Sequence, residues 1–565
     1  MNNNKAIPII CGVVVILAAA IVCLSVGLSD KIGSSDPSEL NAESAYKMLS
    51  ESAELVDITN YPASKGTVTY DTAGSASELP DIESSYPYVV TPKNKDIVVE
   101  IFSSPEKAGN GTDGWLKELA EDYNKSNASV NGKSVGIALR SISSGTQIDY
   151  IESGTYIPDA ITPSASMWAD MLEFSGTDLI LINDKMVGNT AGVLIDNATY
   201  SSLEASYGTV DIKTIITATE NGTITAGYTN PFSSTSGLNF LASTLYSYDE
   251  SNPLSSAAVD GFNRFQSNVP FVAYNTLQMR TAAENTTFTC FINEYQGYYN
   301  NSELKNNYKF LAYGIRHDNP LYAIDGISQD KLDALKAFSD FCSTNSAVEL
   351  ATRYGFNLME NYTSTIPATD GNTWTQMQKV WKKNKNNGKP IAAVFVLDTS
   401  GSMSGEPLNA LKDSLNNSMK YINSSNYVGV VSYSTNVNVD LPIGLFDINQ
   451  QAYFQGAVSG LTASGNTATY SALAQAAIML EDFMAENSNV QPMIFLLSDG
   501  KQNEGASLKE ITAPIQYFSI PIYTIGYNAD LDELKMISSL NEAASIDADN
   551  DDVIYQLKNL FNANL

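Results

Sequence analysis

Residues 391–402 read IAAVFVLDTSGS, an unbroken apolar run that ends in an aspartate and a short Ser/Thr/Gly loop. Such a run is typical of a central strand that is buried on both faces of a parallel sheet. Three similar runs follow, YVGVVSYS at 427–434, QPMIFLLSD at 491–499 and IPIYTIGY at 520–527. Amphipathic stretches at 408–422, 470–486 and 551–565 supply helices between and after them. We therefore predict a doubly wound α/β domain over residues 390–565.

Oxygen-bearing side chains stand at the ends of these predicted strands. The first strand leads into Asp398, Ser400 and Ser402, the segment ASGNTATYSAL carries Thr467, and Asp499 ends a later strand before Gly500. In an open parallel sheet the loops at the carboxyl ends of the strands converge on one crevice. Two carboxylates and three hydroxyls there are hard ligands that suit Mg²⁺, with Mn²⁺ and Ca²⁺ as alternatives.

The elements DTSGS, GNTATYSAL and LLSDG, in this order, resemble those of a von Willebrand factor type A domain with a metal-ion-dependent adhesion site. The resemblance covers residues 390–565. It implies that Ser400, Ser402 and Thr467 bind the metal through hydroxyl oxygens. It also implies that Asp398 and Asp499 bind it directly or through water, and that a protein partner completes the coordination with a carboxylate.

Strands also alternate with helices earlier in the chain, at 96–104, 134–146 and 159–172. With the segment 228–246, YTNPFSSTSGLNFLASTLY, this pattern resembles extracellular solute-binding proteins of the periplasmic type, over residues 96–365. The resemblance implies a second doubly wound domain of two lobes that hold a small solute at helix amino termini. The candidate contacts are serines near predicted strand ends and helix starts: Ser103, Ser104, Ser144, Ser234 and Ser236. The basic stretch KKNKNNGK ends a predicted linker at 366–389.

Residues 6–28 contain no charged side chain, and about 20 apolar helical residues cross a bilayer. We expect residues 1–28 to be a transmembrane anchor, with a removed secretory segment as the alternative. The acidic, Ser-rich residues 29–95 then form a stalk. Lys5 lies on the short side, which predicts a single-pass cell-membrane protein with its bulk outside the cell. Outside this segment, Cys290 and Cys342 form either one disulfide or two buried thiols.

The composition excludes several classes of function. The chain has 565 residues, with 62 acidic and 32 basic side chains and a formal charge of -30. This acidity excludes nucleic-acid binding, which needs a basic face. The single histidine, His317, leaves too few ligands for a nitrogen-rich zinc site, and a serine triad would have to use it. We therefore predict that the protein is not an enzyme.

Two functions remain. The first is a bacterial cell-surface adhesion protein that binds a partner protein through the metal site and carries a solute-binding-like domain. The alternative is an extracellular solute receptor that works with an ABC-type transporter. The sequence identifies neither the partner nor the solute.

Overall fold

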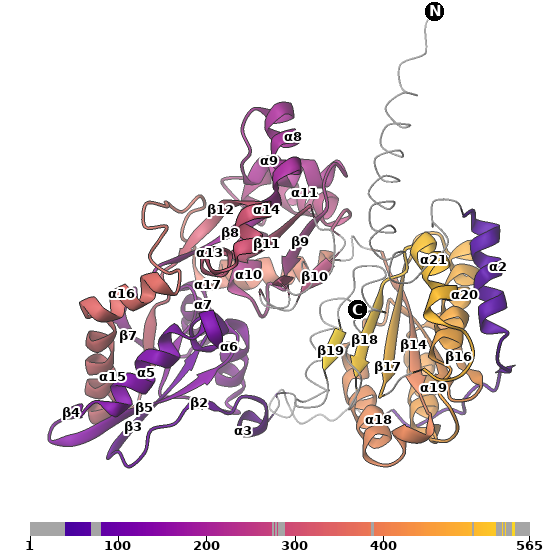
Figure 1. The fold of residues 1–565 in the computed structure, drawn as a ribbon, viewed down its shortest axis with the longest axis horizontal. Coiled ribbons are helices and arrows are strands. Elements are labelled where there is room, and N and C mark those ends of the chain that lie inside the picture. The colour runs from indigo at the N-terminus through magenta and orange to yellow at the C-terminus, as the bar shows by residue number, and fades with distance from the viewer. Residues whose placement is uncertain are drawn as a thin grey trace, which may run out of the picture. The chain divides into compact units, whose positions relative to one another are not determined.

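The computed structural model describes residues 40–68, 79, 81–269, 271–273, 276, 279–280, 289–385, 389–499, 502–526, 534, 537 and 545–547. The chain divides into two compact units (Figure 1). The outer unit combines residues before Tyr70 with residues after Lys389, and the inserted unit spans Asp71–Gly388. Both units combine helices with sheets.

The outer unit is built on one seven-stranded sheet with the order β1-β16-β15-β14-β17-β18-β19. Neighbouring strands run parallel, except that β16 is antiparallel to β15. The strands are β1 (Ile58–Thr59), β14 (Ile391–Asp398), β15 (Tyr427–Tyr433), β16 (Val437–Leu445), β17 (Gln491–Ser498), β18 (Ile522–Gly526) and β19 (Ser545–Asp547).

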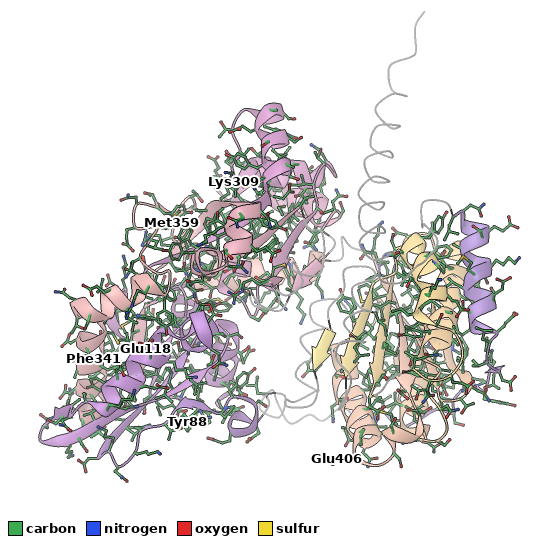
Figure 2. The ribbon with its side chains drawn as sticks, viewed as in Figure 1. Tyr88, Glu118, Lys309, Phe341, Met359 and Glu406 are labelled. Carbon is green, nitrogen blue, oxygen red and sulfur yellow. The ribbon has the colours of Figure 1, made fainter. Side chains whose placement is uncertain are left out.

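Helices cover both faces of this sheet (Figures 1 and 2). They are α2 (Ala42–Ala53), α18 (Glu406–Ser418), α19 (Ile448–Gly460), α20 (Thr469–Glu486) and α21 (Leu508–Phe518). Every residue of β14 is buried, and successive side chains enter opposite cores. Phe395 and Leu397 join the core beneath α18 and α19, whereas Val394 and Val396 join the core beneath α20 and α21. The apolar side chains of β14 therefore contribute to two cores, and its last residue, Asp398, lies next to the loop that follows.

A segment from before the inserted unit completes the outer unit, and we call residues 40–68 the N-terminal strap. Its helix α2 packs against α20 and α21, and its strand β1 pairs with β16. Ala45, Leu49 and Ala53 lie on one face of α2 and are fully buried. The sequence placed this segment in a projecting stalk over 29–95. The structure places it on the outer unit, because this apolar face is covered by neighbouring helices.

The strap crosses α19 at a glycine. A Cβ on Gly456 would lie 1.8 Å from the backbone oxygen of Ser64, whereas a Cβ on Gly460 would have no neighbour within 4 Å. We expect Gly456→Ala to displace the strap locally and to lower the free energy of unfolding by about 1–3 kcal/mol. Urea denaturation of the full chain measures this change, and hydrogen exchange over residues 58–66 should become faster. Gly460→Ala is the matched control in the same helix, and equal stability of both variants would contradict the close contact.

The inserted unit has two lobes, each with its own sheet. The first sheet has the order β2-β5-β3-β6-β13-β7, with β4 paired to β5, and the second has the order β10-β9-β11-β8-β12. The chain leaves the first sheet after β7 and returns to it at β13. The strands are β2 (Tyr88–Val90), β3 (Ile97–Ser103), β4 (Ser129–Val130), β5 (Lys133–Ser141), β6 (Ala160–Thr162), β7 (Leu179–Asn183), β8 (Asn189–Asp196), β9 (Ala226–Thr229), β10 (Phe271–Ala273), β11 (Cys290–Glu294), β12 (Tyr308–His317) and β13 (Leu321–Ile324).

Both sheets are mixed rather than wholly parallel. The returning strand β13 runs antiparallel to β6 and β7, and β8 runs antiparallel to β11 and β12. The helices of the first lobe are α3 (Ile82–Ser85), α4 (Pro105–Ala108), α5 (Trp115–Lys125), α6 (Ser144–Ser153), α7 (Met167–Ser175), α15 (Gln329–Cys342) and α16 (Asn345–Arg353). Those of the second are α8 (Asn197–Tyr207), α9 (Ile212–Glu220), α10 (Thr235–Tyr248), α11 (Ser256–Gln266), α13 (Tyr295–Asn300) and α14 (Ser302–Asn307).

The last helix of the inserted unit, α17 (Gly371–Asn384), lies where the sequence predicted a linker. It contacts α7 of the first lobe and α10 and α11 of the second. Trp374, Met377 and Trp381 are buried along one face of this helix. The segment is therefore a strut between the two lobes, because its aromatic face is covered from both sides.

No helix in the described part of the chain is both long enough and apolar enough to cross a bilayer. The predicted N-terminal transmembrane helix and the single-pass membrane localisation are therefore not supported by the described structure. The segment on which both predictions rested, residues 6–28, lies outside the described residues, as does the predicted helix at 551–565. Cys290 and Cys342 are both buried and free, so they are two thiols rather than one disulfide.

Candidate metal centre and solute cavity

Asp398 ends the central strand β14, and its carboxylate is fully buried. Oδ1 accepts a hydrogen bond from the backbone N–H of Ser400 at 2.8 Å. Oδ2 accepts from the Ser498 hydroxyl at 2.6 Å and from the Tyr433 hydroxyl at 3.2 Å. Burial raises the pKa of Tyr433, so its hydroxyl keeps the proton that it donates. Asp398 is therefore held rigidly at the edge of the sheet.

A chain of hydrogen bonds connects this edge to Asp499. Ser400 Oγ lies 3.0 Å from Ser402 Oγ, and the Ser402 hydroxyl donates to Asp499 Oδ1 at 2.9 Å. Asp499 follows β17, the parallel neighbour of β14, so two residues far apart in sequence meet at one end of the sheet. Burial raises the pKa of Asp499, and the negative charge of Asp398 adds to this effect.

Thr467 lies on the third loop and is buried. Its backbone N–H donates to Asn503 Oδ1 at 2.9 Å, and its carbonyl accepts from the N–H of Asn503 at 3.1 Å. On the other side, the N–H of Gly401 donates to the carbonyl of Gly465 at 3.0 Å. These hydrogen bonds connect the Thr467 loop to the loops after β14 and β17. The structure places all five predicted ligands on three connected loops at one sheet edge.

The donor set fits a hard divalent cation. Carboxylate and hydroxyl oxygens are ligands of Mg²⁺, Mn²⁺ and Ca²⁺, and the site contains no nitrogen or sulfur ligand. Within the described residues, no three His, Cys, Asp or Glu side chains cluster closely enough to hold a metal. A cation at this site would therefore depend on the hydroxyls of Ser400, Ser402 and Thr467 as well as on the two carboxylates. When bound, it would offer a positive centre to an outside ligand.

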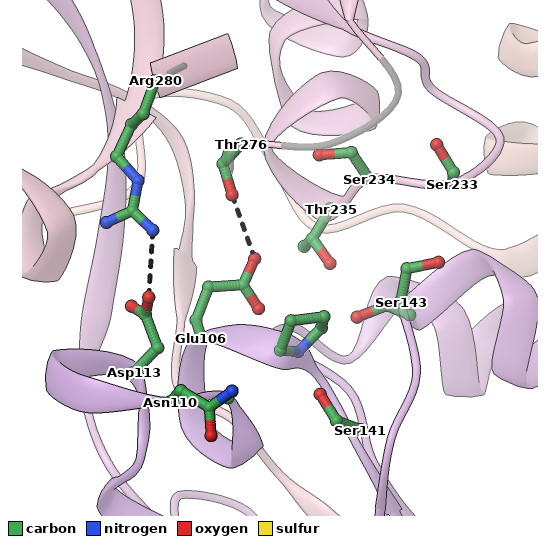
Figure 3. A pocket seen from close by; sticks show the side chains of 13 residues that line it. Glu106, Asn110, Asp113, Ser141, Ser143, Ser233, Ser234, Thr235, Thr276 and Arg280 are labelled. Carbon is green, nitrogen blue, oxygen red and sulfur yellow. Dashed lines mark hydrogen bonds and ion pairs between the residues drawn. The ribbon is translucent and has the colours of Figure 1, made fainter. Parts of the chain in front are cut away.

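A cavity of about 320 Å³ lies between the lobes of the inserted unit (Figure 3). The first lobe contributes Pro105, Glu106, Gly109, Asn110, Asp113, Ser141, Ser143 and Ser144, and the second contributes Ser233, Ser234, Thr235, Thr276 and Arg280. Helices α6 and α10 begin at two of these lining residues, Ser144 and Thr235. The contacts that cross between the lobes at this cavity include those from Arg280 Nη2 to Asp113 Oδ2 at 3.0 Å and from the Thr276 hydroxyl to Glu106 Oε1 at 3.2 Å.

The five serines predicted to contact a solute have different positions. Ser144 and Ser234 line the cavity, whereas the other three are buried and are not among its lining residues. The Ser236 hydroxyl donates to Glu294 Oε1 at 2.9 Å, and the Ser103 hydroxyl donates to the Ser104 carbonyl at 3.3 Å.

The charged residues of the cavity, Glu106, Asp113 and Arg280, were not predicted from the sequence. No local motif marks them, because Arg280 meets Asp113 across 167 positions of sequence. His317, the single histidine, is fully buried elsewhere, with Nδ1 2.8 Å from Glu294 Oε1.

The outer unit is thus an α/β sheet with an oxygen-rich candidate metal centre at the ends of its parallel strands. Residues 393–562 match the family model of the von Willebrand factor type A domain. The chain therefore contains such a domain at its C-terminal end, as the sequence motifs predicted.

Similarity to individual proteins is low. The voltage-dependent calcium channel subunit alpha-2/delta-2 of Homo sapiens is 24% identical over 161 residues, which cover 27% of this chain and 14% of the relative. A von Willebrand factor type A structure from Catenulispora acidiphila is 21% identical, with a TM-score of 0.28, and the match covers 31% of this chain and 42% of that one. A periplasmic thiamin binding protein is 12% identical, with a TM-score of 0.39, and the match covers 51% of this chain and 96% of that one. At these values the similarities identify neither a ligand nor a partner.

Proposed function

We propose that the outer unit binds a partner protein through a divalent cation, with Mg²⁺ as the first candidate. The connected path from Asp398 through Ser400 and Ser402 to Asp499 carries this proposal. Mg²⁺ takes about six oxygen ligands, so five protein side chains leave a position for an outside group. A carboxylate of the partner is the natural sixth ligand, because the cation supplies the opposite charge.

The net charge of the chain is unfavourable for a partner that presents carboxylates. The protein carries a formal charge of -30, so its net charge repels an acidic partner. A bound cation reverses the sign locally, which makes recognition of a carboxylate depend on the metal. Binding should therefore fail when the cation is removed.

A pair of neighbouring serines offers a test of this proposal. Ser402 belongs to the candidate centre, whereas Ser404 lies two positions further on, and both are exposed. We expect partners captured by the full chain in Mg²⁺ to be lost in chelator and with Ser402→Ala, and to be retained with Ser404→Ala. Quantitative mass spectrometry of the captured proteins measures this, followed by binding assays with one purified partner and its Asp or Glu variants. Capture that is unchanged by chelator and by Ser402→Ala would contradict the proposal.

We also propose, as a second function, that the inserted unit is a receptor for a small polar solute. The observation that supports it is the cavity of about 320 Å³ between its lobes, which is within the usual size range of ligand sites. A ligand at 100 times its dissociation constant stabilises a protein by about 2.7 kcal/mol. Thermal-shift measurements on the full chain with a panel of solutes test this function, and a panel without any stabilising member would count against it.

A further inference from the structure

Three hydroxyls of the cavity wall already accept hydrogen bonds from the protein. Ser144 Oγ accepts from the backbone N–H of Ser164 at 3.3 Å, and Thr235 Oγ1 accepts from the indole N–H of Trp168 at 2.8 Å. Ser234 Oγ accepts from the Thr229 hydroxyl at 2.8 Å. A hydroxyl that accepts keeps its own proton to donate. These three hydroxyls can therefore act as donors, which favours a ligand group that accepts hydrogen bonds.

Two helices add to the preference for an acceptor. Ser144 is the first residue of α6 and Thr235 is the first residue of α10, helices of 10 and 14 residues. The amino end of a helix carries partial positive charge and favours anions. Hydroxyl donors and two helix starts in one wall favour an acceptor with negative charge, which is an oxyanion.

The other side of the cavity contains a carboxyl oxygen that has no hydrogen-bond partner among the described residues. Figure 3 shows Glu106, Asn110 and Asp113 on the side away from Ser233 and Ser234. Glu106 Oε1 accepts from Thr276, but Oε2 is buried and has no hydrogen-bond partner in the described part of the protein. The Asp113 carboxylate already accepts from Arg280 and from Gln296. A buried oxygen without a partner is unfavourable, so a ligand that reaches Glu106 is favoured when it offers this oxygen a hydrogen bond.

A hydroxyl suits Glu106 better than an ammonium group does. Burial raises the pKa of Glu106, and the negative charge of Glu294 adds to this effect. A carboxyl group with a raised pKa is a poor counterion for an amine, whereas both its protonated and its ionised forms hydrogen-bond to a hydroxyl.

The remaining lining restricts the ligand further. None of the described lining residues is aromatic, so this part of the wall offers no stacking surface for a planar ring. A bare tetrahedral ion at the donor wall would leave the carboxyl side of the cavity unmatched.

We infer that this cavity binds a small hydroxylated oxyanion, with its phosphate or carboxylate against Ser144, Ser234 and Thr235 and a hydroxyl against Glu106. The inference rests on the proposed solute-receptor function of the inserted unit and assigns its class of solute. Each end of the ligand is matched by its own wall. The intact molecule therefore binds more tightly than either half alone.

Titration calorimetry on the full chain tests this inference with four probes. Glycerol 3-phosphate and glycerate combine an oxyanion with hydroxyls, whereas inorganic phosphate and glycerol each represent one half. We expect at least one of the combined probes to bind about tenfold more tightly than either half, and the tighter of the two identifies the oxyanion as phosphate or carboxylate. Equal affinity for a combined probe and inorganic phosphate, or for a combined probe and glycerol, would overturn the assignment.

Two variants test the hydroxyl side and the carboxyl side of the cavity separately. Ser144→Ala removes one donor, and we expect it to weaken binding of the preferred combined probe by about tenfold, as loss of a hydrogen bond to a charged group does. Glu106→Leu removes the acceptor at similar size, and it should abolish the preference for that probe over its oxyanion half. Ser201→Ala, on an exposed position of α8 outside the cavity, is the matched control. Variants that bind like Ser201→Ala would overturn the inference.

A wider thermal-shift panel of amino acids, amines and unmodified sugars tests the class of ligand separately from the solute-receptor function. Stabilisation by one of these solutes, with none from the hydroxylated oxyanions, would overturn the class of ligand and leave the solute-receptor function standing. No stabilisation by any solute would overturn both.

Discussion

Replacing Asp398 with asparagine is expected to weaken Mg²⁺ binding by the full chain about 100-fold. At 1.4 kcal/mol per tenfold this is about 2.8 kcal/mol. The amide has nearly the same shape as the carboxylate but carries no charge, and Asp398 supplies one of the two carboxylates of the candidate centre. The burial of Asp398 increases the effect, because the attraction between its carboxylate and a cation is stronger where the effective dielectric constant is low. Isothermal titration calorimetry with MgCl₂ measures the affinity directly.

The control for this prediction is Asp413→Asn, which removes an aspartate from the exposed face of α18. It should bind Mg²⁺ as the unmodified chain does. Asp398 also accepts three hydrogen bonds, so the unfolding of both variants is compared in chelator. Ser402→Ala is a second variant that leaves this buried network intact and should also weaken binding. Mg²⁺ affinity within about threefold of the unmodified chain in both site variants would exclude these loops as the metal site.

The positions of the candidate ligands could be predicted because each lies beside a strong local pattern. The apolar run of β14 predicts a buried central strand, and parallel strands bring their carboxyl ends to one edge. Asp398 and Asp499 therefore lie at the same edge of the sheet. Ser498, the residue before Asp499, donates a hydrogen bond to the Asp398 carboxylate across 100 positions of sequence. Pattern and topology were enough here, because the site uses strand ends rather than particular side-chain packing.

The strap and the cavity could not be predicted in the same way. β1 has two residues, too few to show a periodicity, and Thr59 finds its partner Asn438 across 379 positions. Five serines were predicted as solute contacts. Of these five, Ser144 and Ser234 line the cavity, whereas the Ser236 hydroxyl donates to the buried Glu294. Which serine faces a cavity depends on the phase of a helix and on long-range partners, and neither can be read from local sequence.

The helix α17 is a different case, because its pattern was present in the sequence. Trp374, Met377 and Trp381 have the spacing of one helix face, but the adjoining Lys/Asn-rich stretch reads as a polar boundary. In the structure the buried face extends to Trp381, and Lys382 and Lys383 stand on the exposed side of the last turn. A polar run therefore marked the end of a helix rather than a linker.

Trp381→Ala should lower the free energy of unfolding of the inserted unit by about 3–5 kcal/mol, the usual cost of truncating a buried tryptophan. Trp381 is fully buried, its indole N–H donates to the Tyr228 hydroxyl at 2.6 Å, and its ring lies 5.9 Å from that of Phe232. Urea denaturation of the full chain measures the loss. Lys383→Ala, exposed in the same turn, is the control and should change stability by less than about 0.5 kcal/mol. Because a flexible linker would tolerate both substitutions alike, equal stability of the two variants would show that α17 does not hold the lobes together.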